Sequence, residues 1–438
     1  MKHNIIFYFS DQQKWDTLNS EIMPNVWGLG EEGVLFENSF TCQPVCGPAR
    51  ACLQTGKYAT ECGCYWNGIP LPEKTKTLAD YFNENGYDTA YIGKWHLASD
   101  RTPGIGLHCE KTAVPKEKQG SYKYWRAADV LEFTSHGYDG YIFDEDGNKI
   151  DFTGYRVDCI NDFALEYINN HNDEKPFFMF ISQLEPHHQN DRKHFEGPKE
   201  SIGKYRDYPI PEDLSFLPGD YNEEYPDYIA SINRLDDNIG RLVATLKEKG
   251  IYDNTIIIYT SDHGCHFKTR NMEYKRSCHD SCIHTPLVFG GGAIRKNKNN
   301  DDLVSLIDLP PTILSLAGIP VPENYSGYTL PVNGEDIQER DCVFIQISES
   351  HIGRAVRTKK WKYSAKAIGS GWHKPSAVHY FDDFLYDLKN DPNEKNNLVN
   401  DENYAKIISQ MRTLLAREMV KAGERKPKFH KPIKILIK

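Results

Sequence analysis

The chain has 438 residues, of which 39% are hydrophobic and 26% are charged, so it can bury a large core and is not an intrinsically disordered protein. Its 52 Lys and Arg stand against 62 Asp and Glu, which gives a formal net charge of -10. This balance excludes the overall positive field of a protein that binds nucleic acid or anionic membranes. An anionic substrate could still bind in a local basic pocket.

Short apolar runs alternate with helical patterns through most of the chain. Four of these runs, which predict buried strands, lie at 4–10, 87–92, 177–182 and 255–260. A 3.6-residue apolar period from Ile229 to Leu246 predicts a long helix, closed by Gly250. Residues 303–318 predict a short strand or loop and then a helix, whereas the polar stretch 101–150 predicts a long loop region. The alternation predicts an α/β fold, with a large, mainly parallel sheet sandwiched by helices.

The pattern changes after about residue 340. The segments VFIQIS, RAVRTKKWKYSA and HYFDDFLYDL predict antiparallel strands. Residues 404–422 predict an amphipathic helix, and the basic tail 424–438 is expected to be poorly ordered or to lie on the surface. We therefore expect a catalytic α/β domain at 1–340 and a small α+β domain at 341–438.

Cysteines and apolar segments bear on the compartment. The 11 cysteines are odd in number and include no zinc-type CxxC pair. The apolar run from Ile5 to Phe9 is too short for the core of a signal peptide, and no stretch approaches the roughly 18 apolar residues of a membrane span. We expect a reduced, cytoplasmic protein without a membrane segment.

Each of the four predicted strands runs into a cluster of charged, amide or imidazole side chains. In chain order the clusters are Asp11-Gln12-Gln13, Gly93-Lys94-Trp95-His96, Glu185-Pro186-His187-His188 and Asp262-His263-Gly264. The carboxyl ends of parallel strands lie at one edge of the sheet, where ligands bind. The sequence therefore predicts one cleft built from distant parts of the chain.

The residue types in these clusters suit a metal ion and an anion. Asp11, Gln12 and Asp262 offer oxygen ligands and His263 offers a nitrogen, a set that favours calcium, magnesium or manganese over zinc. Lysines and histidines beside such a metal suit an anionic substrate.

A fifth element contains Cys46. Pro48 fits the first turn of a helix and Gly56 its C-terminal cap, which places Cys46 at the N-terminus, where free N–H groups stabilise negative charge. A buried structural cysteine before a short helix is the alternative interpretation.

The segment CGPAR at 46–50, followed by TG, and the segment GYDTAYIGKWH at 86–96 resemble the two signatures of the formylglycine-dependent sulfatases. These enzymes belong to the alkaline-phosphatase-like superfamily. The similarity continues through EPHHQ, SDHG, residues 275–280, IDLPPTILSLAGIP, RTKKWKY and LYDLKNDPNEKNNL, and so spans almost the whole chain. One position departs from the first signature, because Gln54 stands where an apolar residue is usual.

The resemblance implies an unusual nucleophile. A formylglycine-generating enzyme would oxidise Cys46 to Cα-formylglycine, with Pro48 and Arg50 in its recognition motif. One hydroxyl of the hydrated aldehyde would attack sulfur and expel the alcohol, and loss of a proton from the other would release sulfate. A plain serine or cysteine could not eliminate sulfate in this way.

The resemblance also implies the metal site. Its ligands would be Asp11, Gln12, Asp262 and His263 with an oxygen of the modified Cys46, and the ion would be Ca²⁺, with Mg²⁺ or Mn²⁺ as alternatives. Many relatives have Asp in place of Gln12 and Asn in place of His263. The set found here resembles the branch that includes phosphonate monoester hydrolases.

Roles for the remaining residues follow from the same resemblance. Arg50 would orient the modified residue, Lys94 would bridge it and the sulfate, and His96 would take the proton in the elimination. His187 and Lys275 would bind sulfate, and either could protonate the leaving oxygen. The predicted substrate-binding residues are Lys94, His187, His188, Lys275, Trp372 and His373.

We therefore expect a sulfatase that hydrolyses a sulfate monoester of a carbohydrate or an aryl alcohol. One alternative is a phosphonate monoester hydrolase or phosphodiesterase that uses the same residues. A further alternative is a catalytically inactive protein that binds sulfate or glycan, but the joint retention of Cys46, Arg50, Lys94 and Lys275 argues against it. Trp372 and His373 could stack on a sugar or aryl ring.

Overall fold

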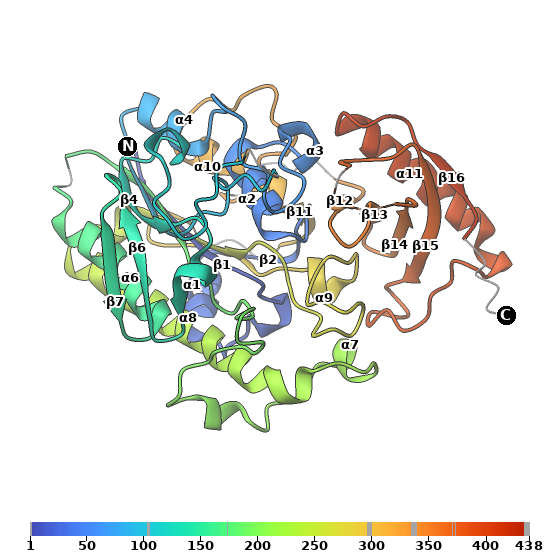
Figure 1. Ribbon diagram of the computed structural model, residues 1–438, viewed down its shortest axis with the longest axis horizontal. Coiled ribbons are helices and arrows are strands. Elements are labelled where there is room, and N and C mark those ends of the chain that lie inside the picture. The colour runs from blue at the N-terminus through green and yellow to red at the C-terminus, as the bar shows by residue number, and fades with distance from the viewer. Residues whose placement is uncertain are drawn as a thin grey trace.

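The computed structural model describes residues 2–102, 106–172, 174–295, 300–333, 340–369, 371–372 and 374–432. A large sheet with helices on both faces lies beside a smaller C-terminal sheet (Figure 1). None of the helices in the described ranges combines the length and the apolar composition needed to cross a bilayer.

Within the described residues, the larger sheet has 11 strands. From one edge to the other they are β11 (Asn300–Ser305), β2 (Val34–Phe40), β10 (Leu287–Gly290), β9 (Thr255–Ser261), β1 (Asn4–Ser10), β8 (Phe177–Ser182), β3 (Asp88–Lys94), β4 (Tyr124–Ala128), β6 (Asp139–Asp144) and β5 (Ser135–His136), and β7 (Lys149–Thr153) pairs with β6. The five neighbours from β9 to β4 are all parallel, with Phe7 of β1 opposite Ile258 and Phe180. Antiparallel pairs lie towards both edges. The predicted α/β class and its four strands are confirmed.

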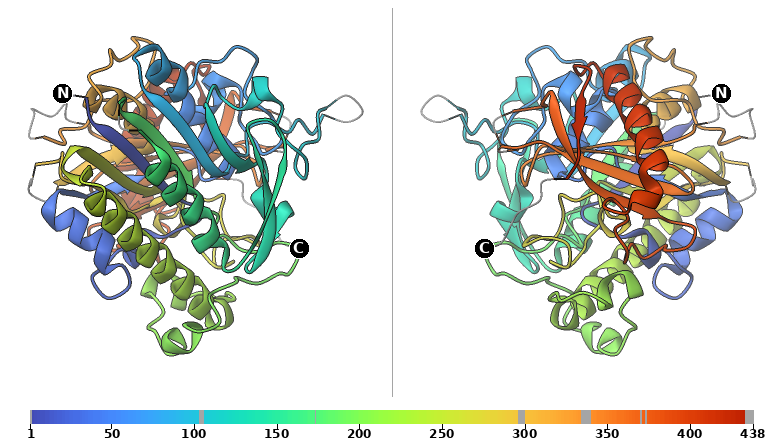
Figure 2. Two further views of the ribbon diagram at one scale, coloured as in Figure 1. Left: turned by 90° about the vertical axis from the view of Figure 1, so that its left-hand side faces the viewer. Right: turned by 90° about the vertical axis from the view of Figure 1, so that its right-hand side faces the viewer.

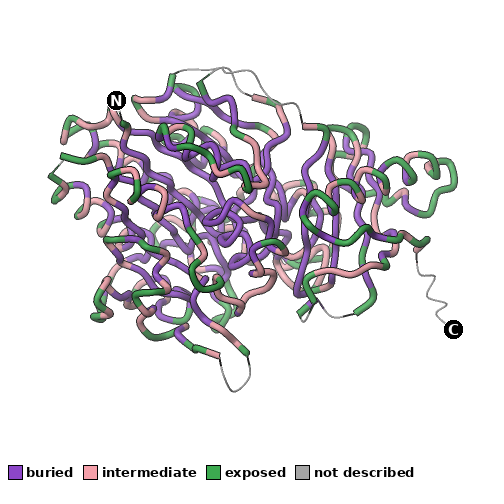
Figure 3. The backbone as a smooth tube through the Cα atoms, turned by 90° about the horizontal axis from the view of Figure 1, so that it is seen from above, coloured by how far each residue is buried: buried purple, intermediate pink, exposed green. Residues whose placement is uncertain are grey.

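Helices cover both faces of this sheet (Figure 2). They are α1 (Pro24–Glu32), α2 (Cys46–Thr55), α3 (Ala59–Cys62), α4 (Leu78–Glu84), α5 (Leu131–Thr134), α6 (Arg156–Asn170), α7 (Glu212–Ser215), α8 (Tyr221–Glu248), α9 (Asp280–Ile283) and α10 (Leu309–Leu316). Successive side chains of a strand point to opposite faces. Phe7 and Phe9 therefore pack with α2, α4 and α10, whereas Ile6 and Tyr8 pack with α1, α6 and α8. The strands are buried on both sides at the centre of the molecule (Figure 3).

The prediction of a long loop at 101–150 is wrong in part. This stretch contains β4, which continues the parallel sheet beside β3, and a hairpin of β6 and β7 at the sheet edge. The strand β4 is short, and the hairpin is polar because its outer surface faces solvent, so neither gave a periodic signal. Residues 103–105 lie outside the described residues.

The described part of the C-terminal sheet has five strands, covered by the helix α11 (Ala405–Lys421). Its strands are β12 (Val343–Ile347), β13 (Gly353–Arg357), β14 (Trp361–Lys366), β15 (His379–Asp387) and β16 (Lys428–His430). The first four are antiparallel, and the helix expected at 404–422 is present.

The expectation that the tail 424–438 is poorly ordered or lies on the surface is wrong for its first part. Strand β16 pairs with β15, and the carboxylate of Glu424 is buried against Arg354 at 2.7 Å, so the first part of the tail is built into the sheet. Residues 433–438 lie outside the described residues. The division into two domains at residue 340 stays a prediction.

Candidate active site

The carboxyl ends of the central strands bring the predicted polar residues together. Asp11 follows β1, and its carboxylate lies 2.9 Å from Lys94 Nζ at the end of β3. It lies 3.8 Å from His263 Nε2, which follows β9, and 4.0 Å from His187 Nε2, which follows β8. One carboxylate thus faces residues from three other strand ends.

Cys46 is the first residue of α2, and the helix ends at Gly56 in the left-handed conformation, with φ of 66°, as the sequence predicted. The Cys46 side chain is 1% exposed. Its Sγ atom lies 2.7 Å from Lys275 Nζ, 3.3 Å from His263 Nε2 and 3.4 Å from Asp11 Oδ1. The cysteine therefore sits at the centre of the cluster.

The surroundings of the Cys46 side chain disfavour its charged form. Burial and then the negative charge of Asp11 raise the pKa of Cys46 to about 12, although Lys275 and Lys94 act in the opposite direction. Burial removes the water that would stabilise the thiolate, and this loss is larger than the stabilisation by the lysines and the helix N-terminus. The unmodified side chain is therefore a thiol at neutral pH.

Arg50 lies one helical turn after Cys46 and connects three strand ends. Its guanidinium donates to Asp11 Oδ2 at 2.9 Å, to the carbonyl of Lys94 at 2.9 Å and to Ser182 Oγ at 2.5 Å. These groups lie at the ends of β1, β3 and β8. Arg50 is fully buried there, and its donors orient both Asp11 and the backbone of Lys94.

Four buried side chains form a candidate metal centre. The ligand atoms of Asp11, Cys46, Asp262 and His263 all lie within 4.8 Å of one another. Asp262 Oδ2 is buried without a hydrogen-bond partner, and His263 Nδ1 donates to the carbonyl of Gly264, which leaves Nε2 directed at the cluster. Two buried carboxylates and an oriented imidazole fit a divalent cation.

The two carboxylates titrate differently. Burial and then the charge of Asp11 raise the pKa of Asp262 to about 7. Burial also acts to raise the pKa of Asp11, but Lys94, His187 and Arg50 outweigh it and hold that pKa well below its usual range. Asp11 is thus the ionised partner of the cations, and Asp262 is the one that would gain most from a metal.

Hydrogen bonds fix both the backbone and the side chain of Gln12. Its backbone has φ of 74°, its N–H donates to Asp262 Oδ1 at 2.9 Å, and its amide nitrogen donates to Cys265 Sγ at 3.3 Å. Only the amide oxygen remains for a metal. The role of Gln12 as a ligand stays a prediction.

The predicted anion-binding residues Lys275 and His187 are neighbours. Lys275 Nζ lies 3.1 Å from His187 Nε2. His187 Nδ1 lies 2.7 Å from the carbonyl of His188 and donates to it, so Nε2 is the acceptor. Burial and then Lys275 lower the pKa of His187 well below its usual value. The pair is therefore a lysine ammonium beside a neutral imidazole.

Two further histidines differ in their surroundings. His96 has φ of 61°, and its buried Nδ1 has no hydrogen-bond partner; burial and then Lys94 hold its pKa well below the usual value. His188 stacks on Tyr274, with ring centroids 4.3 Å apart. The role of His188 in substrate binding stays a prediction.

The loop between β14 and β15, which contains Trp372 and His373, is described only in part. Trp372 is 38% exposed and meets Trp66 edge to face, with ring centroids 5.6 Å apart. Trp66 precedes Asn67, whose side-chain oxygen accepts the N–H of Gly47, next to Cys46, at 2.9 Å. His373 lies outside the described residues.

Two residues at the site escaped the sequence analysis. Glu132 is buried and accepts from Lys94 Nζ at 3.0 Å. It follows β4, so the argument from strand ends would have found it had that strand been predicted. Asn67 lies in an irregular segment without any periodic or motif signal.

Comparisons with known proteins show the family to which the chain belongs. The sulfatase family model matches residues 3–319, and the model for the N-sulphoglucosamine sulphohydrolase C-terminal region matches residues 270–421. An ulvan-active sulfatase of Formosa agariphila is 28% identical over 451 residues, which cover 97% of this chain and 82% of that protein.

Two solved structures share the fold. BT4656, in complex with its substrate D-glucosamine-2-N,6-O-disulfate, superposes with a TM-score of 0.77 at 23% identity and covers 98% of this chain and 99% of its own. The phosphonate monoester hydrolase SpPMH of Silicibacter pomeroyi has a TM-score of 0.70 at 19% identity, with 96% of each chain covered. The chain belongs to the sulfatase family of the alkaline-phosphatase-like superfamily. It is a sulfuric ester hydrolase.

Proposed function

We propose that this enzyme hydrolyses a sulfate monoester of a carbohydrate, with a Cα-formylglycine made from Cys46 as the nucleophile. The observation that carries the proposal is the position of Cys46, whose Sγ atom is within 3.4 Å of Lys275, His263 and Asp11. In its hydrated form formylglycine supplies one hydroxyl for attack and a second for release of sulfate. Maturation would require a formylglycine-generating enzyme as a partner.

A divalent cation is part of the proposal. Asp11, Asp262 and His263, together with Gln12 and the modified Cys46, would hold it, and Ca²⁺ is proposed ahead of Mg²⁺ or Mn²⁺ because most of the set is oxygen. The cation would supply charge for the nucleophile and for the sulfate oxygens. The orphaned Asp262 Oδ2 supports this assignment.

The protein's own side chains position the reacting groups and carry the protons. Arg50 fixes Asp11 and the end of β3, and the Lys94 ammonium is held between Asp11 and Glu132. His96, kept neutral by burial, is the proposed acceptor of the proton lost in sulfate release.

Lys275 is the proposed proton donor to the leaving oxygen. Burial acts to lower its pKa, but the neighbouring Cys46 and Asp11 outweigh burial and raise it. His187 Nε2 accepts from Lys275 and orients it, and it could also transfer the proton. Positive donors at the point where charge develops stabilise the transition state.

A sulfated sugar is the substrate class that we favour. The relative from Formosa agariphila is described as ulvan-active, and BT4656 has a disulfated glucosamine as its substrate. Exposed aromatic rings such as Trp372 suit the apolar face of a pyranose, and Trp66 supports it from the side. His188 and His373 complete the proposed contacts to the leaving group.

A phosphonate monoester is the second candidate. Gln12 and His263 resemble the metal set of phosphonate monoester hydrolases, and SpPMH has the same fold. A cation, two lysines and a hydrated aldehyde suit either tetrahedral anion, so these residues do not separate the two reactions.

One experiment separates them. The enzyme is co-expressed with a formylglycine-generating enzyme, the mass of the Cys46 peptide is measured, and kcat/KM is determined for an aryl sulfate and an aryl phosphonate monoester on the same preparation. We expect the aldehyde mass and a preference for sulfate, after which a panel of sulfated sugars follows. A preference for the phosphonate would replace the substrate class, and an unmodified cysteine with full activity would remove the nucleophile.

The compartment is proposed from the cysteines. All 11 are free thiols, and ten of them are buried. This state suits the reducing cytoplasm.

A further inference from the structure

Glu349 reaches the catalytic centre from the C-terminal sheet. It follows β12 in a loop, has φ of 67° and is 1% exposed. Its own N–H donates to the carbonyl of Gly371, beside Trp372, at 3.3 Å. A carboxylate buried this deeply in a strained backbone conformation needs compensating partners.

Both oxygens of the Glu349 carboxylate bind residues of the larger sheet's loops. Oε1 accepts the backbone N–H of Asn67 at 2.6 Å, and Oε2 accepts from Arg276 Nε at 2.5 Å. The neighbouring Ser350 adds a third link, because its hydroxyl donates to the carbonyl of Arg276 at 3.0 Å. Glu349 thus joins two segments that are otherwise distant in sequence.

Each of these segments leads directly to the nucleophile. Asn67 accepts the N–H of Gly47, which follows Cys46, and a Cβ at Gly47 would lie 2.9 Å from the Asn67 side-chain oxygen, so the two are closely packed. Arg276 follows Lys275, whose Nζ lies 2.7 Å from Cys46 Sγ. The Lys275–Cys46 contact is therefore enclosed by a ring of residues that Glu349 closes.

We propose that Glu349 is a positioning residue, through which the C-terminal sheet sets the distance between Lys275 and Cys46. It acts through Asn67 and Arg276 and does not touch the substrate. The inference rests on the proposed function in that Lys275 and Cys46 are taken as reacting groups. A displacement of about 1 Å at a reacting group can cost about 100-fold in rate.

The chain offers a matched control in Glu394. It is also buried, at 3% exposed, and also belongs to the C-terminal part of the chain. It accepts the backbone N–H of Asp280 at 2.7 Å and pairs with Lys362 at 2.6 Å. It therefore links the same two parts of the molecule as Glu349 does, but through partners other than Asn67 and Arg276.

The test compares Glu349→Gln with Glu394→Gln in the formylglycine-containing enzyme. Both variants should lose thermal stability. Only Glu349→Gln should lose kcat, by about 10- to 100-fold, with KM within about 2-fold of the wild type. Wild-type kcat in Glu349→Gln, or an equal loss in both variants, would overturn the proposal.

A second measurement does not depend on activity. Crystal structures of the unmodified wild type and both variants give the separation of Lys275 Nζ and Cys46 Sγ, which should lengthen in Glu349→Gln alone. If the separation is unchanged, the positioning role is rejected, whether or not the wild type is active. If the wild type hydrolyses no sulfate ester, the proposed function is rejected, and the measured separation still tests the positioning role. If Glu349→Gln does not fold, Asn67→Ala breaks the same ring and is measured in the same two ways.

Discussion

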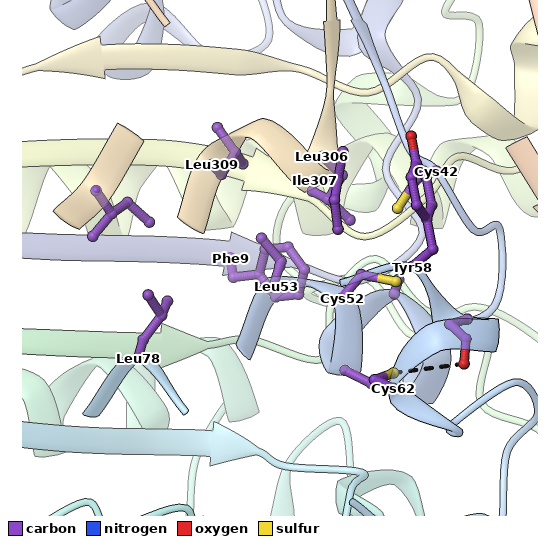
Figure 4. Close-up of a cluster of buried hydrophobic side chains, with 14 of the residues drawn as sticks. Phe9, Cys42, Cys52, Leu53, Tyr58, Cys62, Leu78, Leu306, Ile307 and Leu309 are labelled. Carbon is purple, nitrogen blue, oxygen red and sulfur yellow. Dashed lines mark hydrogen bonds between the residues drawn. The ribbon is translucent and has the colours of Figure 1, made fainter. Parts of the chain in front are cut away.

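Two cysteines on the helix α2 have opposite surroundings. Cys46 begins the helix and meets Lys275, His263 and Asp11. Cys52 lies six residues on, about 240° around the helix, and is buried in an apolar cluster with Cys42, Leu53 and Tyr58 (Figure 4). Burial raises the pKa of both thiols. Neither burial nor residue type therefore distinguishes Cys46, the proposed nucleophile, from Cys52; the charged groups around Cys46 do.

The largest expected effect is that of Cys46→Ala. We expect turnover to fall by roughly 10⁴-fold or more, because the nucleophile is lost, while Tm stays near that of the wild type. Initial rates on an aryl sulfate and a thermal melt check this. More than a trace of activity would contradict the covalent mechanism.

The next effects concern the cations around Cys46. Lys275→Ala and Lys94→Ala should each lower kcat by about 10²- to 10³-fold, which corresponds to about 2.7–4 kcal/mol of transition-state stabilisation. The control is Lys362→Ala, since Lys362 is equally buried but binds Asp280 and Glu394 away from Cys46. We expect Lys362→Ala to lose stability and to keep kcat, and wild-type kcat/KM in either active-site variant would remove that lysine from the mechanism.

Metal removal tests the charged surroundings of Cys46, which Cys52 lacks. Chelation should reduce activity to background, and calcium should restore it. In the metal-free protein the pKa of Asp262 is raised to about 7 by burial and by Asp11, whereas it is near 4 in the unfolded chain. The folded state thus holds an extra proton between about pH 4 and pH 7, and the free energy of unfolding falls as pH rises through that range.

A cation that replaces this proton should stabilise the protein most above pH 7. Calcium chloride should therefore raise Tm more at pH 8 than at pH 5, measured by scanning fluorimetry against EDTA-treated protein. Asp262→Asn should remove the calcium effect and that part of the pH slope that comes from Asp262. Equal shifts at the two pH values would refute the assignment of Asp262 as a ligand.

The smallest expected effect on activity is that of Cys52→Ala. Removal of the sulfur from the apolar cluster should lower the free energy of unfolding by about 1–2 kcal/mol and leave kcat unchanged. Urea unfolding and initial rates measure the two quantities. A loss of kcat at full occupancy of the folded state would show that the two ends of α2 are not independent.

Most of the fold could be predicted from the sequence, because its central strands are long apolar segments. Strands β1, β3, β8 and β9 are buried on both faces, and their apolar runs are unmistakable. Strand β4 and the β6–β7 hairpin were missed, because one is short and the other faces solvent. The tail was missed because its course depends on long-range contacts, the buried pair of Arg354 and Glu424 and the pairing of β16 with β15.

The site was predictable where residues follow strands and not elsewhere. Asp11, Lys94, His187 and Asp262 could be placed together from strand ends alone. Glu132 was lost with β4, and Asn67 and Glu349 could not be found, because their positions depend on long-range contacts between irregular segments. The raised pKa of the Cys46 thiol could not be predicted either, because it depends on burial, which a position at a helix N-terminus does not reveal.

The contact between Lys275 and Cys46 joins residues 229 positions apart, which has a consequence for biosynthesis. At roughly 5–20 residues per second, about 10 to 45 seconds separate the synthesis of Cys46 from that of Lys275. During that interval the pocket that encloses the cysteine does not exist, and Glu349 is still to be made. The order of the chain would thus give the proposed formylglycine-generating enzyme time to reach the nascent thiol before folding encloses it.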